Sequence, residues 1–316
     1  MKKTNKRKSS HITKPHPVIP PPINKGETIG LVAPAGSLAN RKNFNAGVKL
    51  LEERGFRVKF NRRLLDRKGY LAGSDRERAD EFNKMWADPE VKALVAVRGG
   101  YGCLRMLDMI DMKKVRSTPK ILIGFSDLTV LLNAIHKKTG LVTFHGPVVT
   151  SLATIDRKSQ KSFFNTLLGK TPKQILPSGI KVLHEGKAKG VLLGGNLTTL
   201  VHLIGTPHEI SWQDTILFIE DIGEKPYSLD RLLTHLSKAG RLQKIKGLIL
   251  GSFTDEERKE RAILQKTVQS RIKELLEAKK IPVWANFPTG HSRRNLTLPV
   301  GVQAELDTST NILTLS

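Results

Sequence analysis

The chain has 316 residues, enough for one large domain or two smaller ones with a substantial hydrophobic core. Apolar residues make up 39% and charged residues 26%, which is ordinary for a globular protein and argues against wholesale disorder. The single cysteine, Cys103, excludes a disulfide framework and a cysteine-rich zinc site. No uncharged apolar run reaches the roughly 20 residues of a membrane helix, so we expect a soluble protein.

The chain begins with a basic, proline-rich segment. Residues 1–25 hold seven Lys or Arg, five Pro and no acidic residue, and they lack the apolar stretch of a secretory signal. We therefore expect a disordered basic arm. The remaining chain still has 46 basic and 29 acidic residues, a net charge of +17. This excess indicates either a general compositional bias or a polyanionic partner, such as nucleic acid, an acidic wall polymer or an anionic substrate.

Residues 26–155 alternate between strand and helix patterns. Ser74 and Glu77 form a capping-box signature, which predicts a helix that runs through Met85 and Trp86. An alternation of strands and helices is typical of a parallel sheet with crossover helices. The strands expected in this part of the chain are residues 28–33, 56–60, 93–97 and 121–125.

The second half of the chain has a different pattern. Residues 156–189 are polar and weakly patterned, and we interpret them as a connector. A second domain is expected over residues 190–316. Its predicted elements are strands at 215–219 and 247–251, a charged amphipathic helix at 255–280 and a last strand region that starts at Val283.

Two strand ends could carry chemistry, because ligands of open parallel sheets bind at the carboxyl ends of strands. The first is the sequence Arg-Gly-Gly-Tyr-Gly at residues 98–102. Its glycines permit a sharp turn that aims N–H groups at a bound oxygen. The sequence matches neither the P-loop nor the dinucleotide-binding pattern, and a simple strand-to-helix turn is the alternative.

The second strand end carries Ser126, which lies between a buried strand and a helix. This context is that of a nucleophile elbow, and the N–H of Asp127 at the helix start could help to hold an oxyanion. An ordinary serine helix cap is the alternative, since Leu128 stands where the G-x-S-x-G pattern requires glycine.

A serine nucleophile needs a general base and an acid that orients the base. His291 lies in a loop after a strand, and Glu220 closes an apolar strand, so both are available. Their convergence on Ser126 does not follow from the sequence. Zinc chemistry is the competing mechanism, but the chain has no H-E-x-x-H motif, so we expect no metal.

These motifs together resemble the LD-carboxypeptidases, serine peptidases that share their fold with the microcin-C immunity hydrolases. The resemblance runs from about Gly26 to the C-terminus. Its marks are six short motifs in order: residues 30–36 (GLVAPAG), 98–102 (RGGYG), 124–127 (GFSD), 194–197 (GGNL), 220–231 (which contains ED, PY and DR) and 290–291 (GH).

The resemblance implies an α/β fold with two domains. A Rossmann-like parallel-sheet domain at 26–155 would carry the nucleophile, and a smaller, β-rich domain at 190–316 would carry the acid and the base. It further implies a triad of Ser126, Glu220 and His291.

The resemblance also implies residues that assist the triad. The oxyanion hole would consist of the backbone N–H groups of Gly100 and Asp127. Because a carboxypeptidase has to bind a terminal carboxylate, Arg98 and Tyr101 in the glycine-rich turn are candidates for substrate binding.

The activity implied is hydrolysis of the bond before a terminal D-alanine in murein tetrapeptides. It would proceed in the cytoplasm during cell-wall recycling, without a cofactor, in a homodimer. One alternative is a microcin-type hydrolase of peptide–nucleotide amides with the same triad. The other is a basic nucleic-acid-binding protein, against which the aromatic content of 5% and the lack of a binding signature argue.

Overall fold

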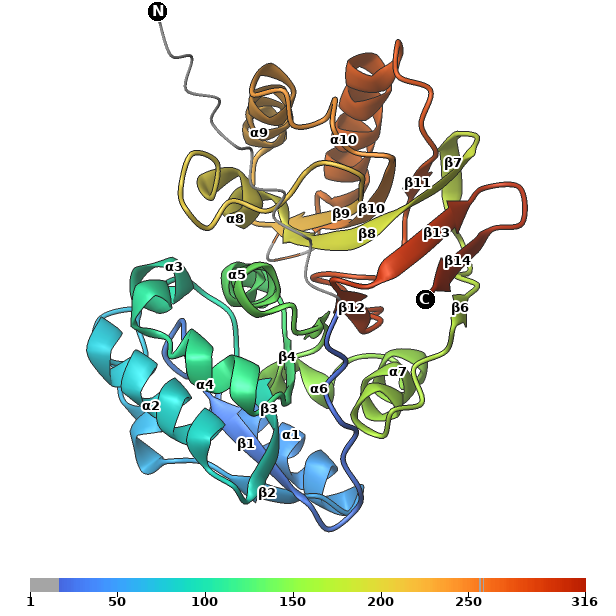
Figure 1. Cartoon of the computed structure of the whole chain (residues 1–316). Coiled ribbons are helices and arrows are strands. Elements are labelled where there is room, and N and C mark those ends of the chain that lie inside the picture. Colours follow the sequence, from blue (N-terminus) through green and yellow to red (C-terminus); the bar gives the residue numbers. More distant parts are fainter. Residues whose placement is uncertain (1–16, 256, 258) are drawn as a thin grey trace, which may run out of the picture.

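The computed structural model describes residues 17–255, 257 and 259–316 of the chain, and it contains two β-sheets in an α/β arrangement (Figure 1). The first sheet has the strand order β12-β5-β4-β3-β1-β2, and all its neighbours are parallel except β12 and β5. Its strands are β1 (Thr28–Val32), β2 (Arg57–Lys59), β3 (Val91–Ala96), β4 (Ile121–Gly124), β5 (Thr143–His145) and β12 (Leu298–Val300). The predicted parallel sheet is therefore confirmed.

The helices of the first half lie between these strands in the chain, as the alternating pattern predicts. The capping box of Ser74 and Glu77 is formed and opens α2, which satisfies two N–H groups at the helix start. The helices are α1 (Arg41–Glu53), α2 (Asp75–Ala87), α3 (Cys103–Met106), α4 (Met112–Ser117), α5 (Thr129–Thr139), α6 (Val149–Leu152) and α7 (Arg157–Leu167), with 3₁₀ turns at Arg62–Leu65, Leu107–Met109 and Ser126–Leu128.

The second sheet is mixed and has the order β6-β14-β13-β8-β9-β10-β11-β7. Its centre, β8-β9-β10-β11, is parallel, and its outer strands are antiparallel. The strands are β6 (Gln174–Ile175), β7 (Lys181–His184), β8 (Lys187–Asn196), β9 (Thr215–Ile222), β10 (Gly247–Thr254), β11 (Val283–Ala285), β13 (Gln303–Asp307) and β14 (Ile312–Leu315). The helices of this part are α8 (Leu197–His202), α9 (Pro226–Lys238) and α10 (Arg261–Leu276).

The segment expected to be a connector differs from the expectation. Residues 156–189 contain α7, β6, β7 and the start of β8, so they belong to the packed structure. The polar pattern arises because β7 and the first residues of β8 are partly exposed. In β8, for example, Lys187 and Lys189 point to solvent and form ion pairs with Glu305 of the neighbouring strand β13.

The basic arm also differs from the expectation over the residues that are described. Residues 1–16 lie outside the described residues, but residues 17–25 pack on the fold. The N–H of Val18 donates to Gly140 (2.8 Å), and Ile23 is 1% exposed, with its N–H bonded to Leu167 (2.8 Å). Prolines favour an extended backbone, and the buried side chains of Pro20 and Ile23 anchor this segment.

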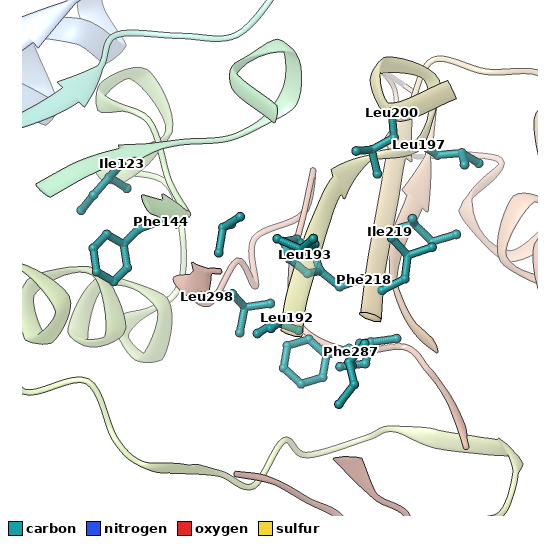
Figure 2. Close-up of a cluster of buried hydrophobic side chains, with 14 of the residues drawn as sticks. Ile123, Phe144, Leu192, Leu193, Leu197, Leu200, Phe218, Ile219, Phe287 and Leu298 are labelled. Atoms are coloured by element: carbon teal, nitrogen blue, oxygen red, sulfur yellow. The ribbon is translucent and has the colours of Figure 1, made fainter. Parts of the chain in front are cut away.

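One continuous hydrophobic core joins the two sheets (Figure 2). Side chains of β4 and β5, such as Ile123 and Phe144, belong to the same buried cluster as Leu192 of β8 and Phe218 of β9. Strand β12 reinforces this connection, because it comes from the C-terminal part of the chain and pairs with β5 of the first sheet. Side chains from both sheets are therefore held in a fixed relation to one another.

None of the described helices is both long and apolar enough to cross a lipid bilayer.

Candidate active site

Ser126 occupies a strained turn at the carboxyl end of β4. Its backbone has φ +65°, a left-handed conformation that costs a non-glycine residue on the order of 1–3 kcal/mol. Phe125 is the extended residue before the 3₁₀ turn, and no side-chain hydrogen bond caps that turn. Ser126 is therefore not an ordinary helix cap, and its strained turn is the geometry expected of a nucleophile elbow.

The glycine-rich turn after β3 lies directly against Ser126. A Cβ on Gly99 would come within 2.6 Å of the Ser126 Cβ and 2.7 Å of its Oγ. Gly100 has φ +119°, and a Cβ there would lie 3.0 Å from the backbone N of Gly36. At Gly99 a side chain would collide with that of Ser126, whereas at Gly100 the positive φ and the close approach of the Gly36 backbone both favour glycine.

Two buried charged side chains fix the glycine-rich turn. The Asp127 carboxylate accepts the N–H of Cys103 (2.7 Å), the residue that follows the turn. Arg78 is 1% exposed and donates to the carbonyls of Gly102 (2.9 Å) and Pro34. The segment after Ser126 is thereby tied to the turn that contains Gly100. Sequence reasoning considered only the backbone of Asp127 and missed Arg78.

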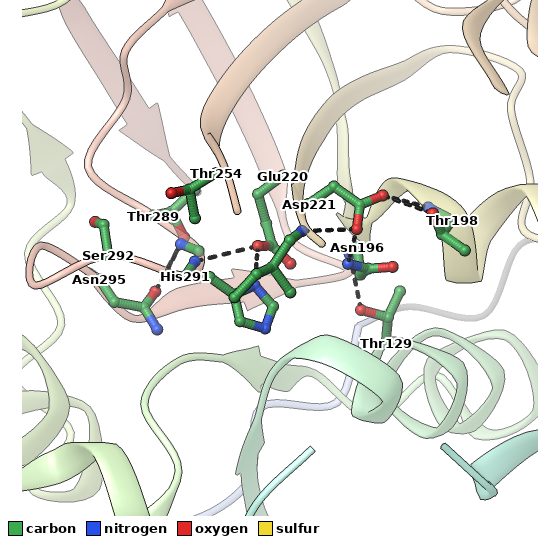
Figure 3. A network of polar contacts seen from close by, with 12 residues as sticks. Thr129, Asn196, Thr198, Glu220, Asp221, Thr254, Thr289, His291, Ser292 and Asn295 are labelled. Atoms are coloured by element: carbon green, nitrogen blue, oxygen red, sulfur yellow. Dashed lines mark hydrogen bonds and ion pairs between the residues drawn. The ribbon is translucent and has the colours of Figure 1, made fainter. Parts of the chain in front are cut away.

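Glu220 and His291 form a hydrogen-bonded pair at the carboxyl side of the second sheet (Figure 3). His291 Nδ1 lies 2.6 Å from Glu220 Oε2, and the backbone N–H of His291 donates to the same oxygen (3.2 Å). Glu220 is 0% exposed. With Nδ1–H donating to the carboxylate, Nε2 of a neutral imidazole is the nitrogen that can accept a proton.

A local irregularity of the sheet makes room for this pair. The register between β9 and β10 shifts opposite Glu220, at Gly251 and Ser252. A Cβ on Gly251 would lie 3.1 Å from the Glu220 Cβ, and one on Gly290 would lie 2.5 Å from Glu220 Oε2. Bulges often re-aim side chains beside functional sites, and here two glycines allow the His291 loop to approach the carboxylate.

The charge state of Glu220 follows from its surroundings. Burial by itself raises the pKa of this carboxyl, but the charge and hydrogen bonds of His291 outweigh burial and hold the pKa below its usual range. Glu220 is therefore a carboxylate at neutral pH, able to orient His291 and to stabilise its protonated form.

A cavity of about 410 Å³ brings most of the predicted residues together. Ser126, His291, Gly100 and Arg98 line it. The Phe125 ring contacts the His291 ring at a centroid distance of 4.6 Å. Glu220 lies behind His291 and does not line this cavity. The arrangement places a serine, an oriented imidazole and a glycine-rich turn around one space, as acyl transfer requires.

Tyr101 lines a neighbouring cavity of about 420 Å³ and not the one that contains Ser126. Arg98 and Gly100 line both cavities. Tyr70 and Arg67, which sequence reasoning missed, line the second cavity, and the rings of Tyr70 and Tyr101 lie 6.0 Å apart. No sequence signal marks Tyr70, because it lies in a loop far from Tyr101 in the chain.

A second buried carboxylate, Asp221, belongs to the ED motif noted in the sequence, but no role was predicted for it. It accepts hydrogen bonds from Asn196 Nδ2 (2.7 Å) and from the backbone and hydroxyl of Thr198 (2.9 and 2.8 Å), as Figure 3 shows. The N–H of Asn196 donates to the hydroxyl of Thr129 (2.9 Å) in the first residue of α5. Burial and the neighbouring Glu220 raise the pKa of Asp221 to about 6. This network ties the second sheet to the helix that follows Ser126.

Among the residues that the structure describes, no group of three or more His, Cys, Asp or Glu side chains is placed to hold a metal ion.

Comparison with known protein families identifies both parts of the chain. Residues 29–146 match the model of the LD-carboxypeptidase N-terminal domain, and residues 189–306 match that of the LD-carboxypeptidase C-terminal domain.

Individual relatives extend over nearly the whole chain. The probable murein peptide carboxypeptidase of Bacillus subtilis is 36% identical, with 92% of each chain covered. The murein tetrapeptide carboxypeptidase of Pseudomonas aeruginosa is 33% identical over 88% of this chain and 92% of its own. The solved structure of the microcin C7 self-immunity protein MccF superimposes with a TM-score of 0.86 at 27% identity, covering 95% of this chain and 98% of its own.

Proposed function

Because this chain belongs to the LD-carboxypeptidase family of peptidases, we propose that it is a serine carboxypeptidase that removes the terminal D-alanine from murein tetrapeptides. The observation that carries the proposal is the Glu220–His291 pair, whose imidazole lines the same cavity as Ser126 on its strained turn. Relatives named murein peptide and murein tetrapeptide carboxypeptidase support the substrate class.

The triad performs the chemistry in two stages. In the first stage, His291 takes the proton of Ser126 while Ser126 Oγ attacks the carbonyl of the scissile amide, and Glu220 stabilises the imidazolium that forms. His291 then protonates the D-alanine nitrogen as the C–N bond breaks. In the second stage, His291 activates a water that hydrolyses the acyl-enzyme, which releases the tripeptide and restores Ser126.

The oxyanion of the tetrahedral intermediate needs hydrogen-bond donors. We assign these to the backbone N–H groups of Gly100 and Asp127, one on each of the two segments that meet at Ser126. The bond between the Asp127 carboxylate and Cys103 supports this assignment, because it holds the two segments together before substrate arrives. Each preorganised donor contributes about 2.7–4 kcal/mol to transition-state stabilisation.

Arg98 and Tyr101 are the proposed substrate-binding residues. The guanidinium of Arg98 is fixed by a hydrogen bond from Nη1 to the Ser37 carbonyl (2.9 Å), and no ion pair to an acidic side chain forms at Arg98 in the described part of the chain. It is therefore a positioned cation at the edge of the catalytic cavity, suited to a substrate carboxylate. The exposed rings of Tyr70 and Tyr101 next to it offer flat surfaces for the rest of the substrate.

The similarity to MccF favours one second candidate, a hydrolase of peptide–nucleotide amides with the same triad.

The proposal also includes a homodimer in the cytoplasm. We assign polyanion binding to the basic arm. Deleting residues 1–16 should weaken the retention of the protein on a heparin column at low salt and leave its turnover of murein tetrapeptide unchanged. A truncated protein that is retained as tightly as the full chain would reject this role of the arm.

Incubation of the purified protein with three substrates tests the proposal. Mass spectrometry should detect D-alanine and tripeptide from murein tetrapeptide, with much slower release from the same peptide ending in L-alanine. A peptidyl-adenylate analogue tests the second candidate. Cleavage of the analogue in preference to the tetrapeptide would replace the first proposal by the second, and no cleavage of any of the three would reject both.

A further inference from the structure

A fully buried histidine lies next to the proposed triad and has no part in the mechanism above. His145 is the last residue of β5, where it pairs with Gly124 at the end of the strand that leads to Ser126. It is 0% exposed. On its other side His145 pairs with Leu298 of β12, so the strand is enclosed within the sheet and the side chain has a fixed position.

The ring of His145 is wedged between aromatic residues from the two halves of the site. Its centroid lies 6.0 Å from that of Phe125 and 5.1 Å from that of Phe218, each at an interplanar angle of 75°. Phe125 precedes Ser126 and contacts the His291 ring. Phe218 lies two residues before Glu220 on β9, so the two side chains leave the same face of that strand.

The buried imidazole of His145 destabilises the fold relative to an apolar side chain of similar size. Neither ring nitrogen of His145 has a hydrogen-bond partner among the described residues, and the same holds for Glu220 Oε1. Burying a polar group without a hydrogen-bond partner is unfavourable, because the group loses its bonds to water and gains none in return. A phenylalanine would fill a similar volume between Phe125 and Phe218 without this cost, so packing alone does not account for a histidine at this position.

The titratable groups that act on His145 are those of the triad. Burial lowers the pKa of His145 to about 4, against the opposing effect of the Glu220 charge and with the help of His291. The ring is therefore neutral wherever the triad works. A neutral imidazole keeps one N–H dipole and adds no positive charge that would compete with protonation of His291.

We propose that His145 is a positioning residue, whose neutral imidazole stabilises the buried charge of Glu220 and sets the spacing between the nucleophile strand and the acid strand. This inference rests on the triad of the proposed function but not on the identity of the substrate. Glu220 uses Oε2 for both contacts with His291, and Oε1 has no hydrogen-bond partner among the described residues, so the dipole of the neutral imidazole acts on this carboxylate through space and not through a hydrogen bond.

The sign of the expected effect follows from charge. A nearby N–H dipole partly offsets the negative charge of Glu220. When the dipole is removed, the carboxylate acts more strongly on His291 and favours its protonated form, which cannot accept the Ser126 proton. The acid limb of Ser126 reactivity should therefore move to higher pH, and reactivity at neutral pH should fall.

The test measures the rate at which a fluorophosphonate probe labels Ser126 between pH 5 and pH 9. The variants are His145→Phe, which keeps the packing, and His145→Asn and His145→Gln, which retain a polar amide. His136→Phe is the control, because His136 lies on α5 and lines a different cavity. Ser126→Ala defines the background, and the melting temperature of each variant is recorded.

We expect His145→Phe to remain folded, to be labelled roughly fivefold more slowly at pH 7 and to shift its acid limb upward by on the order of one pH unit. At least one amide variant should recover part of both effects, and His136→Phe should show neither. Labelling of His145→Phe within twofold of wild type with an unmoved limb would overturn the inference. Equal effects in the Phe, Asn and Gln variants would also overturn it, because they would indicate packing alone. If the wild-type protein is not labelled at Ser126, the proposed triad fails as well.

Discussion

Replacing Gly99 by alanine is expected to disable Ser126 without unfolding the protein. The new Cβ would lie 2.6 Å from the Ser126 Cβ and 2.7 Å from its Oγ. Carbon atoms in contact are about 3.5–4.0 Å apart, so the serine side chain has to move by about 1 Å. The φ of Gly99 lies outside the left-handed region, so alanine adds no backbone strain and the effect comes from the collision with Ser126.

The size of the effect follows from this displacement. Misplacing a reacting group by 1 Å can cost about 100-fold in rate, so kcat/KM for murein tetrapeptide should fall by about that factor. Overpacking costs about 1–3 kcal/mol, which for a chain of this length lowers Tm by less than about 10 °C. The assay is D-alanine release, with Tm measured on the same preparation.

Gly205→Ala is the matched control, because a Cβ there meets no atom within 4 Å, although φ is +82°. It should lose about 1 kcal/mol of stability through backbone strain and keep its activity. A folded Gly99→Ala protein with kcat/KM within twofold of wild type would refute the reasoning about close approach.

Three further predictions concern the acid, the buried histidine and the chemistry. Glu220→Gln should lower kcat by roughly 10⁴-fold. It should also move the acid limb of kcat/KM to lower pH, since the charge that favours the imidazolium is gone; an unmoved limb in a pH–rate profile would reject the pairing with His291. His145 has a pKa of about 4 in the folded protein and about 6.5 in the unfolded chain, so the unfolded chain binds a proton that the folded protein excludes between these pH values. The free energy of unfolding should therefore fall by about 3 kcal/mol as the pH falls from above 6.5 to 4. Urea unfolding should show this loss in the wild type and not in His145→Phe, whereas parallel pH curves for the two proteins would contradict it. Activity should survive EDTA, because the nucleophile is a side chain; a loss that added zinc reverses would point to metal chemistry.

The first half of the fold could be predicted because its signals are local. Apolar strand runs and the Ser74–Glu77 capping box locate their elements to within about two residues. The second sheet was harder, since the charged residues at the start of β8 are exposed on one face and look like a connector. The pairing of β12 with β5 joins residues far apart in the chain, and no local pattern indicates it.

The site shows the same division between local and long-range information. The strand-to-helix context of Ser126 is visible in the sequence, but its positive φ and its close packing against Gly99 appear only in the structure. The contact between Glu220 and His291 joins residues 71 apart, so only the fold brings them together. No role was predicted for His145, because it ends a short strand without a sequence motif. The role proposed here depends on its neighbours from both sheets, which only the fold brings together.

The central claim is that Ser126 is the nucleophile, and D-alanine release from murein tetrapeptide by Ser126→Ala tests it most directly. The variant removes only the hydroxyl oxygen of a half-buried side chain that faces the cavity, so it should fold with a nearly unchanged Tm. We predict that its kcat falls by roughly 10⁴–10⁶-fold while tetrapeptide still binds. A folded Ser126→Ala protein that releases D-alanine at near the wild-type rate would contradict the account.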